Sequence, residues 1–227
     1  MTSLNGKIRE TIAFFRDNLP EDLNALLEQG AGEISALEIV ERALKVGDHA
    51  PTFDLPKYGG GTASLAEYLR EGPLVITFYR GVWCPYCNLQ LKEYDDRIDE
   101  FRKLGANIVA VTAEKPGAAD ILKTSGAPED IVAQAVVSVR FDVLHDDGNA
   151  LARDFGLIFE LPDAHKNVLK QIGVDIEALT GSTSYAFADP ATYVIGQDGR
   201  IAYAFVPNNY RKRAEVDALT SALQSLQ

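Results

Sequence analysis

The amino-acid sequence predicts a mixed α/β fold, with a central sheet and helices on both of its faces, preceded by an all-helical segment. Over most of the chain, short apolar and β-branched runs alternate with stretches of helical periodicity. Near the end, two apolar runs flank a Gln197-Asp198-Gly199 turn, which is a strong hairpin signal. The first part of the chain has helical patterns only. We therefore expect two parts, a helical extension over residues 1–45 and a main domain over residues 46–227.

The N-terminal part shows three apolar stripes at helical spacing. They consist of Ile8, Ile12 and Phe15, then Leu23, Leu26 and Leu27, then Ile34, Leu37, Val40 and Leu44. Gly30 and Gly32 are expected to separate the second helix from the third. Because exposed apolar stripes favour aggregation, these helices should cover either the main domain or a second copy of the chain.

The main domain is expected to alternate strands and helices. Apolar, β-branched runs predict strands at residues 53–55, 74–79, 107–112, 140–144, 192–196 and 201–205. Helical periodicity predicts helices at residues 63–69, 118–123, 128–135 and 212–226, and one from just after Cys84 to about residue 104. Gly105 suits the position just beyond the end of that long helix.

Composition and charge exclude several classes of partner. The chain has 227 residues with 22 basic and 33 acidic side chains, a formal net charge of −11. The negative electrostatic potential of such a chain repels phosphate backbones and anionic lipids. Neither nucleic acid nor a membrane surface is therefore an expected partner. No apolar run approaches the roughly 20 residues of a membrane span. The N-terminus resembles neither a secretory signal nor a transit peptide, so the expected location is cytoplasmic.

Both cysteines of the chain lie in one motif, Trp83-Cys84-Pro85-Tyr86-Cys87, between a predicted strand and a predicted helix. A C-x-x-C pair in a cytoplasmic chain indicates a redox dithiol. The structural alternative is half of a zinc site. Zinc usually takes four ligands, and only three scattered histidines remain, so neither a metal nor a cofactor is expected.

The position of the dithiol predicts its reactivity. If the helix begins after Cys84, that residue is the N-cap and Pro85 occupies the first helical position, which proline favours. The Cys84 sulfur is then expected to accept a hydrogen bond from the Cys87 amide. That bond and the helix dipole should lower the pKa of the thiol below about 8.5. We therefore expect Cys84 to be the nucleophile and Cys87 the resolving thiol.

Two neighbours of the motif are candidate supporting residues. Arg80 could place positive charge beside the thiolate or could be an ordinary solvated arginine, and the residues alone favour neither reading. Trp83 is expected to cover the dithiol, which is compatible with a simple packing role. Elsewhere, His145-Asp146-Asp147 reads as a solvated loop. The run Tyr210-Arg211-Lys212-Arg213 reads as basic surface that could bind an acidic partner.

The sequence resembles a known family. Residues 79–87, with the Cys84-Pro85-Tyr86-Cys87 core, resemble the signature of peroxiredoxin-like proteins of the alkyl hydroperoxide reductase/thiol-specific antioxidant superfamily that carry a thioredoxin-type C-x-x-C. Residues 45–53 resemble the opening segment of these domains, residues 141–155 a strand-turn-helix passage, and residues 190–199 their late strand and hairpin. The resemblance covers roughly residues 45–219. It implies a thioredoxin-like fold, commonly a homodimer, and supporting roles for Tyr86 and Pro190.

The sequence also departs from that family. Ordinary peroxiredoxins place a proline and a threonine seven and three residues before the reactive cysteine, where this chain has Thr77 and Gly81. Their arginine near the late strand is replaced by Pro190, where thioredoxins have a proline that is usually cis, so a cis Pro190 is expected. Thioredoxins bury an acid where this chain has Phe78. Arg80 is the hypothetical substitute for the missing arginine.

Three functions follow as hypotheses. The first is a peroxidase for hydrogen peroxide or small organic hydroperoxides, in which Cys84 becomes a sulfenic acid and then a disulfide with Cys87. Thioredoxin, glutaredoxin or glutathione would reduce that disulfide. The second is a thioredoxin- or glutaredoxin-like protein-disulfide oxidoreductase without peroxidase activity. The third is a non-catalytic interaction protein, against which the intact motif argues.

Overall fold

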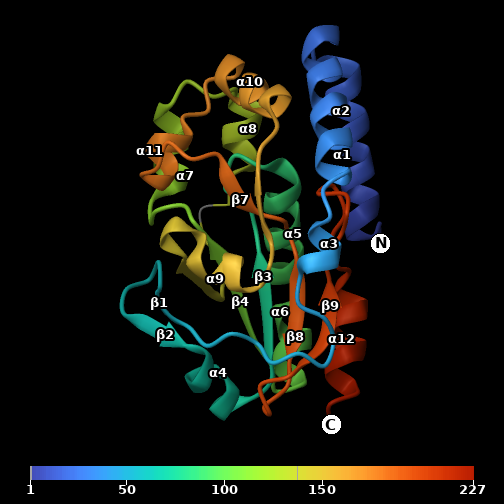
Figure 1. The fold of residues 1–227 in the computed structure, drawn as a ribbon, viewed down its shortest axis with the longest axis vertical. Helices are drawn as coiled ribbons and strands as arrows, with labels where there is room; N and C mark the ends of the chain where they lie inside the picture. Colours follow the sequence, from blue (N-terminus) through green and yellow to red (C-terminus); the bar gives the residue numbers. More distant parts are fainter. Residues whose placement is uncertain (1, 137) are drawn as a thin grey trace.

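A five-stranded mixed sheet forms the centre of the molecule (Figure 1). The computed structural model describes residues 2–136 and 138–227; Met1 and Val137, which the predicted helical extension and main domain include, lie outside the described residues. The strand order is β5-β4-β3-β8-β9, with β3, β4 and β5 parallel and β8 and β9 antiparallel to their neighbours. The strands are β3 (Leu74–Phe78), β4 (Asn107–Thr112), β5 (Asp142–His145), β8 (Thr192–Ile195) and β9 (Ile201–Phe205). These agree closely with the predicted strands.

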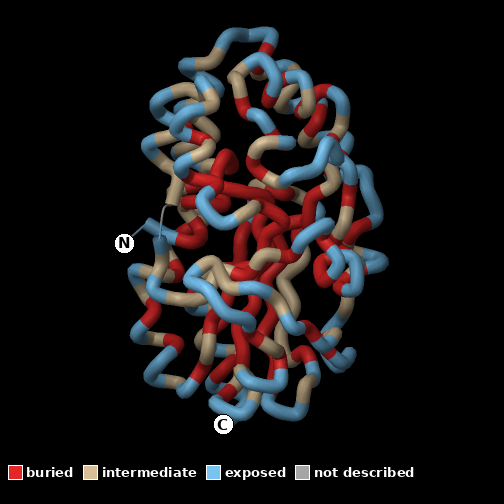
Figure 2. The backbone as a smooth tube through the Cα atoms, turned by 90° about the vertical axis from the view of Figure 1, so that its left-hand side faces the viewer, coloured by how far each residue is buried: buried red, intermediate tan, exposed pale blue. Residues whose placement is uncertain are grey.

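Helices cover both faces of the sheet, as predicted. Side chains alternate along a strand, so Val75 and Ile76 of β3 enter two different hydrophobic clusters. Val75 packs in the cluster that holds Tyr94, and Ile76 in the one that holds Leu151. Figure 2 shows this buried backbone in the middle of the molecule. The helices of the main domain are α4 (Leu65–Glu71), α5 (Pro85–Asp96), α6 (Ile98–Lys103), α7 (Ala118–Thr124), α8 (Glu129–Gln134), α9 (Ala150–Asp154), α10 (Asp163–Gln171), α11 (Ile176–Thr180) and α12 (Val216–Gln224).

The N-terminal helices pack against the rest of the same chain. They are α1 (Leu4–Asn18), α2 (Glu21–Ser35) and α3 (Ile39–Arg42), and they run beside α5 and α10 (Figure 1). The expected break at Gly30 and Gly32 is wrong, because α2 continues through both glycines. A Cβ atom at Gly30 would lie 2.8 Å from the His165 ring. Gly30 therefore permits close packing of α2 on α10 and does not end a helix.

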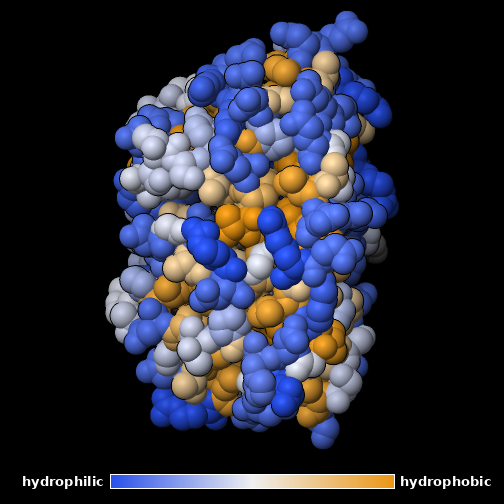
Figure 3. All heavy atoms as spheres, viewed as in Figure 1, coloured by the Kyte–Doolittle hydropathy of each residue, from blue (hydrophilic) through white to orange (hydrophobic). Residues whose placement is uncertain are grey.

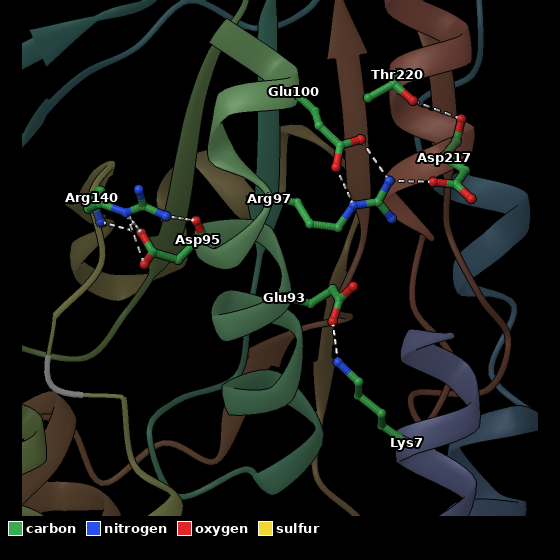
Figure 4. A network of polar contacts seen from close by, with 8 residues as sticks. All are labelled: Lys7, Glu93, Asp95, Arg97, Glu100, Arg140, Asp217 and Thr220. Atoms are coloured by element: carbon green, nitrogen blue, oxygen red, sulfur yellow. Dashed lines mark hydrogen bonds and ion pairs between the residues drawn. The ribbon is translucent and has the colours of Figure 1, made fainter. Parts of the chain in front are cut away.

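The long helix predicted after Cys84 is broken at Arg97 into α5 and α6. Arg97 has non-helical dihedral angles, and its guanidinium bonds Glu100 and, from α12, Asp217 (Figure 4). Figure 4 also shows Glu93 paired with Lys7 of α1 and Asp95 paired with Arg140. Ion pairs thus connect the solvent side of α5 and α6 to three other segments, and they hold the helix that carries the dithiol.

The strand predicted at residues 53–55 is β1 (Asp54–Pro56), shifted by one residue, and it pairs with β2 (Thr62–Ser64). Other short elements have no counterpart in the sequence prediction: β2 itself, and β6 (Ile158–Glu160), which pairs with β7 (Ala186–Ala188). No structure was expected for the segment from β6 to β7, which holds α10 and α11. The loop around Asp146 is not solvated as expected. The Asp146 carboxylate is buried and accepts hydrogen bonds at 2.9 Å from the Leu151 and Ala152 amides, and it thereby caps α9 next to the 3₁₀ turn Asp147–Asn149.

Candidate active site

The dithiol lies at the junction between β3 and α5. Cys84 is the N-cap of α5 and Pro85 its first residue, as the sequence predicted. Both cysteines are free thiols, both are fully buried, and their sulfur atoms are 2.8 Å apart. The expected bond from the Cys87 amide to the Cys84 sulfur is absent, because that amide donates to the Cys84 carbonyl oxygen at 3.0 Å. Groups other than the helix amides must therefore stabilise negative charge on the sulfur atoms.

Arg80 is one such group. Its side chain is 5% exposed, which rules out the reading as a solvated arginine, and its Nη2 donates to the Cys84 sulfur at 3.2 Å. The guanidinium carbon lies 4.1 Å from the ring centre of Tyr210 and 5.0 Å from that of Trp83. Cation–π contacts on these two rings fix the guanidinium in place beside the sulfur.

Arg213 is the second group that can stabilise negative charge on the sulfur atoms. The sequence predicted it to lie on the surface, and that prediction is wrong. It is 1% exposed, and its Nη2 donates to the Cys87 sulfur at 3.2 Å. Its Nη1 donates to the carbonyl oxygens of Tyr210 and Lys212. Within the basic run only Lys212 is exposed. No signal in the sequence separates this buried arginine from the surface residues of a basic run.

The two arginines determine the protonation of the thiol pair. Burial alone would raise the pKa of each thiol. For Cys87, the hydrogen bond shared with Cys84 and the charges of Arg213 and Arg80 outweigh burial, and its pKa lies well below the ordinary value. For Cys84, burial and the hydrogen bond to Cys87 keep the pKa well above the ordinary value. The pair therefore gives up its first proton readily and holds the second between the two sulfur atoms.

Two buried acids, which the sequence analysis missed, lie in the same electrostatic environment. Burial raises the pKa of Glu114 to about 8, opposed by a hydrogen bond from the Val82 amide at 2.8 Å. Burial raises the pKa of Asp189 to about 7, opposed by the charges of Arg213 and Arg80. A negative charge on Cys87 contributes to both upward shifts. Neither acid belongs to a periodic pattern or a motif, so nothing in the sequence marks them.

Glu114 also explains the missing threonine. A Cβ atom at Gly81 would lie 2.3 Å from Oε1 of Glu114 and 2.5 Å from Nε1 of Trp83. The backbone of Gly81 has φ near 153°, a conformation that favours glycine. The carboxylate thus occupies the space that a threonine side chain would need at this position.

The remaining predicted residues have mixed outcomes. Trp83 and Tyr86 are buried, with the Trp83 ring edge-on to Phe187 and the Tyr86 ring against Tyr210. Every peptide bond in the described part of the chain is trans, so the expected cis bond before Pro190 is wrong. Pro190 is buried between β7 and β8, inside a tight turn in which the Ala191 amide donates to the Asp189 carbonyl oxygen. The expected cis Pro190 against the dithiol is therefore not observed.

Within residues 2–136 and 138–227, no three His, Cys, Asp or Glu side chains gather where they could hold a metal ion. No helix among those residues is both long enough and apolar enough to cross a membrane.

Comparisons with known proteins agree on one family. The sequence pattern described as the AhpC/TSA family matches residues 46–204, which is more than half of the chain. Peroxiredoxin Bcp of Escherichia coli is 26% identical over 162 residues, covering 71% of this chain and 85% of that protein. A protein of Mycobacterium tuberculosis named a putative peroxiredoxin is 36% identical over 73 residues, covering 32% of this chain and 46% of that protein. The chain thus spans less than half the length of this second relative.

Solved structures show the same fold. The crystal structure of peroxidoxin BcpB from Mycobacterium tuberculosis aligns with a TM-score of 0.58 at 20% identity, over 81% of this chain and 99% of that chain. Reduced 2-Cys peroxiredoxin from Plasmodium vivax aligns with a TM-score of 0.59 at 14% identity, over 81% of this chain and 82% of that chain. The predicted thioredoxin-like fold is thereby confirmed.

Proposed function

Because the chain belongs to the AhpC/TSA family, we propose that it is a thiol-dependent peroxidase that works through Cys84 and Cys87. The observation that carries the proposal is the pairing of each sulfur with its own buried arginine, Arg80 at 3.2 Å from Cys84 and Arg213 at 3.2 Å from Cys87. Only the thiolate of a cysteine attacks peroxide, and the fixed positive charge of the two arginines favours one thiolate in the pair. A buried guanidinium also stabilises charge that develops on the breaking O–O bond.

Cys84 is the proposed nucleophile. Arg80, Trp83, Pro85 and Tyr86, which flank it along the chain, all line a cavity, whereas Cys87 lies one turn further into α5. The shared proton moves to Cys87, and the Cys84 thiolate attacks the outer oxygen of the hydroperoxide. The O–O bond breaks, Cys84 becomes a sulfenic acid, and the released alkoxide or hydroxide takes up a proton to leave as alcohol or water.

Cys87 then closes the cycle. Its sulfur, 2.8 Å from that of Cys84, displaces the sulfenic hydroxyl as water and forms the Cys84–Cys87 disulfide. Two thiols and one hydroperoxide thus give one disulfide, one alcohol and one water. A dithiol reductant of the thioredoxin or glutaredoxin kind, or glutathione, restores the two thiols.

The cellular setting belongs to the same proposal. A site that must be reduced again after each turnover needs a compartment rich in thiol reductants, and the cytoplasm supplies one. The homodimer implied by the resemblance stays a prediction, which the mass of the protein in solution would test.

The test uses the only tryptophan of the chain, Trp83, which directly precedes Cys84. Reduced protein is mixed with hydrogen peroxide or an organic hydroperoxide, and tryptophan fluorescence is followed in a stopped-flow instrument. We expect a rate linear in peroxide, with a second-order constant of about 10⁴ M⁻¹s⁻¹ or more for at least one of them. Cys84→Ser should abolish the signal, and Cys87→Ser should trap one sulfenic acid per chain.

The opposite result would identify another activity. If neither peroxide changes the fluorescence while oxidised thioredoxin or glutathione does so quickly, the protein is a disulfide oxidoreductase and the peroxidase proposal is wrong. Normal turnover by Cys87→Ser with a dithiol reductant would remove the resolving role of Cys87.

A further inference from the structure

Arg80 and Arg213 are two buried cations that have no carboxylate as a partner. Hydrophilic side chains cover most of the face drawn in Figure 3, where water weakens the interactions between their charges, but these two guanidiniums lie in the interior. Within residues 2–136 and 138–227, they donate hydrogen bonds to the two sulfur atoms and to backbone carbonyl oxygens, and Nε of each is buried without a partner. Because a buried charge needs a compensating charge nearby, both cations depend on negative charge in the site.

The reduced dithiol supplies part of that negative charge. The thiol pair gives up its first proton readily and then carries one negative charge on two sulfur atoms that are 2.8 Å apart. A disulfide carries no charge. Formation of the Cys84–Cys87 disulfide therefore removes the anion that faces both arginines, which is costly unless another group in the site becomes negative.

Asp189 is a buried carboxyl group that can take over this charge. Both of its side-chain oxygen atoms are buried without a hydrogen-bond partner. It lies between β7 and β8, in the tight turn that leads to Ala191, and the Ala191 carbonyl oxygen accepts from the Phe78 amide at 2.8 Å. Phe78 ends β3, from which the chain continues directly to Arg80 and Cys84. The turn that carries this carboxyl is thus attached to the strand that leads into the dithiol loop.

The charged groups around Asp189 act in opposite directions. Arg213 and, to a smaller extent, Arg80 lower the pKa of Asp189, whereas a negative charge on Cys87 raises it. The hydroxyl of Tyr193 on β8 is also buried and couples to Asp189, but it stays neutral because burial raises its pKa above the ordinary value. The disulfide removes the charge on Cys87 and leaves both arginines, so the pKa of Asp189 falls below about 7 when the disulfide forms.

From this arrangement we infer that Asp189 is a redox-linked proton site, which holds a proton while the dithiol is reduced and releases it when the Cys84–Cys87 disulfide forms. The negative charge then moves from the sulfur pair to the carboxylate, and the two buried arginines face an anion in both states. The inference deepens the proposed function, and it rests on that function only for the formation of the disulfide.

The proton balance of the reaction gives this proton a use. Reduction of a hydroperoxide to an alcohol and water takes two electrons and two protons. The two sulfur atoms supply both electrons, but a pair that has already lost one proton supplies only one proton. Asp189 supplies the other, so one thiolate, one thiol, one carboxylic acid and one hydroperoxide give one disulfide, one carboxylate, one alcohol and one water. The dithiol reductant later returns two electrons and two protons, one proton to the sulfur pair and one to Asp189.

The experiment counts protons while the disulfide forms. Reduced protein in weakly buffered solution at about pH 6, below the pKa of Asp189, is mixed with one equivalent of hydrogen peroxide, and an indicator dye records the change in pH. We expect almost no proton uptake per disulfide for the unmodified protein, and uptake of about one proton for Asp189→Asn, which has no proton to supply. At about pH 8 Asp189 is largely ionised in both states, so both proteins should take up about one proton. Glu114→Gln, which neutralises the other buried acid, is the matched control and should behave like the unmodified protein.

An infrared measurement detects the same proton directly. The difference spectrum of oxidised minus reduced protein should show the loss of the C=O stretch of one protonated carboxylic acid. That loss should be present in Glu114→Gln and absent from Asp189→Asn. Because neither side-chain oxygen of Asp189 has a hydrogen-bond partner, the amide of similar shape removes no bond, and its far-UV circular dichroism should match that of the unmodified protein.

Diamide, which oxidises dithiols without a peroxide, separates this inference from the proposed function. If diamide forms the disulfide and neither hydrogen peroxide nor an organic hydroperoxide does so, the peroxidase proposal is wrong, and the proton count with diamide still tests Asp189. Uptake of one proton by the unmodified protein at about pH 6 would overturn the inference. A proton count and an infrared band that are the same in Asp189→Asn as in the unmodified protein would also overturn it.

Discussion

Asn5 forms hydrogen bonds with both the amide and the carbonyl oxygen of the Arg213 backbone. The Asn5 side-chain amide donates to the Arg213 carbonyl oxygen at 2.8 Å, and its Oδ1 accepts from the Arg213 amide at 3.0 Å. In return, the Glu215 carboxylate accepts from the Leu4 and Asn5 amides at 2.9 Å each, at the start of α1 where backbone amides have no partners within the helix. The first turn of α1 thus fixes the segment whose arginine contacts Cys87.

The first prediction tests this link. Asn5→Ala should free the Arg213 backbone, loosen its contact with the Cys87 sulfur and raise the pKa at which the thiol pair loses its first proton. The expected slowing of disulfide formation is about 10-fold, equal to about 1.4 kcal/mol. Thiolate absorbance against pH measures the pKa, and Trp83 fluorescence the rate. Asn18→Ala, at the far end of α1, is the matched control and should behave like the unmodified protein.

The second prediction concerns Arg213 itself. Arg213→Met removes the charge but keeps much of the volume, so the pKa of the thiol pair should rise and the sulfenic acid should persist longer before Cys87 attacks it. Arg213→Lys should recover part of the effect, because it restores charge without the planar fork. The neighbouring exposed Lys212→Ala provides the comparison. A sulfenic acid lifetime that is the same in all three variants would exclude a role for Arg213 in resolution.

The third prediction concerns Arg80. Its replacement by alanine should lower the rate with peroxide about 100-fold, the usual loss when one fixed donor to a developing negative charge is removed. The assay is the stopped-flow measurement with hydrogen peroxide. Arg102→Ala, on the exposed side of α6, should change nothing. An unchanged rate for Arg80→Ala would show that Arg80 does not replace the family arginine.

The fourth prediction restores the missing threonine. Gly81→Thr should destabilise the fold by about 1–3 kcal/mol, because the new side chain overlaps the Glu114 carboxylate. In Gly81→Thr/Glu114→Ala the overlap with the carboxylate is removed and only that with Trp83 remains, so the two changes together should cost less than their sum. Urea denaturation of the unmodified protein, the two single variants and the double variant measures the coupling free energy between the two positions. Strictly additive costs would mean that Glu114 is not what excludes threonine.

The fifth prediction is a pH dependence. The pKa of Glu114 is raised on folding to about 8, so the folded protein binds a proton there that the unfolded chain has lost. Its contribution to stability is therefore present at low pH and is lost as pH rises toward 8. Relative to Glu114→Gln, which cannot titrate, the protein should lose up to about 1.4 kcal/mol per pH unit between pH 5 and pH 8, roughly the interval between the two pKa values. Denaturation curves at several pH values measure this difference, and parallel pH profiles would contradict it.

The sequence predicted the parts of the structure that depend on local pattern. β3, β4, β8 and β9 were found because apolar, β-branched runs are bounded by turn residues, and Cys84 was placed at an N-cap because proline follows it. The segment from β6 to β7 was missed in part because each of these two strands has only three residues, too few to establish an alternating pattern.

The part of the site that the sequence predicted also depends on local pattern. The dithiol and Arg80 lie within a few residues of each other, so one motif brings them together. Arg213 lies 126 residues from Cys87, and only tertiary packing brings it there. Glu114 and Asp189 are isolated acids whose burial follows from the whole fold. A basic run looks the same in a sequence whether its side chains face water or two sulfur atoms.

The distances along the chain also govern when the site comes into existence during synthesis. Asn5 contacts Arg213 across 208 residues, and Glu215 binds the start of α1 across 211. A ribosome adds about 5–20 residues per second. The two cysteines therefore leave the ribosome several seconds before Arg213 is made, and until then Cys87 lacks the arginine that contacts its sulfur in the folded protein. Incomplete chains carry the motif without its second arginine, so the reactive dithiol belongs only to chains that have been translated past residue 215.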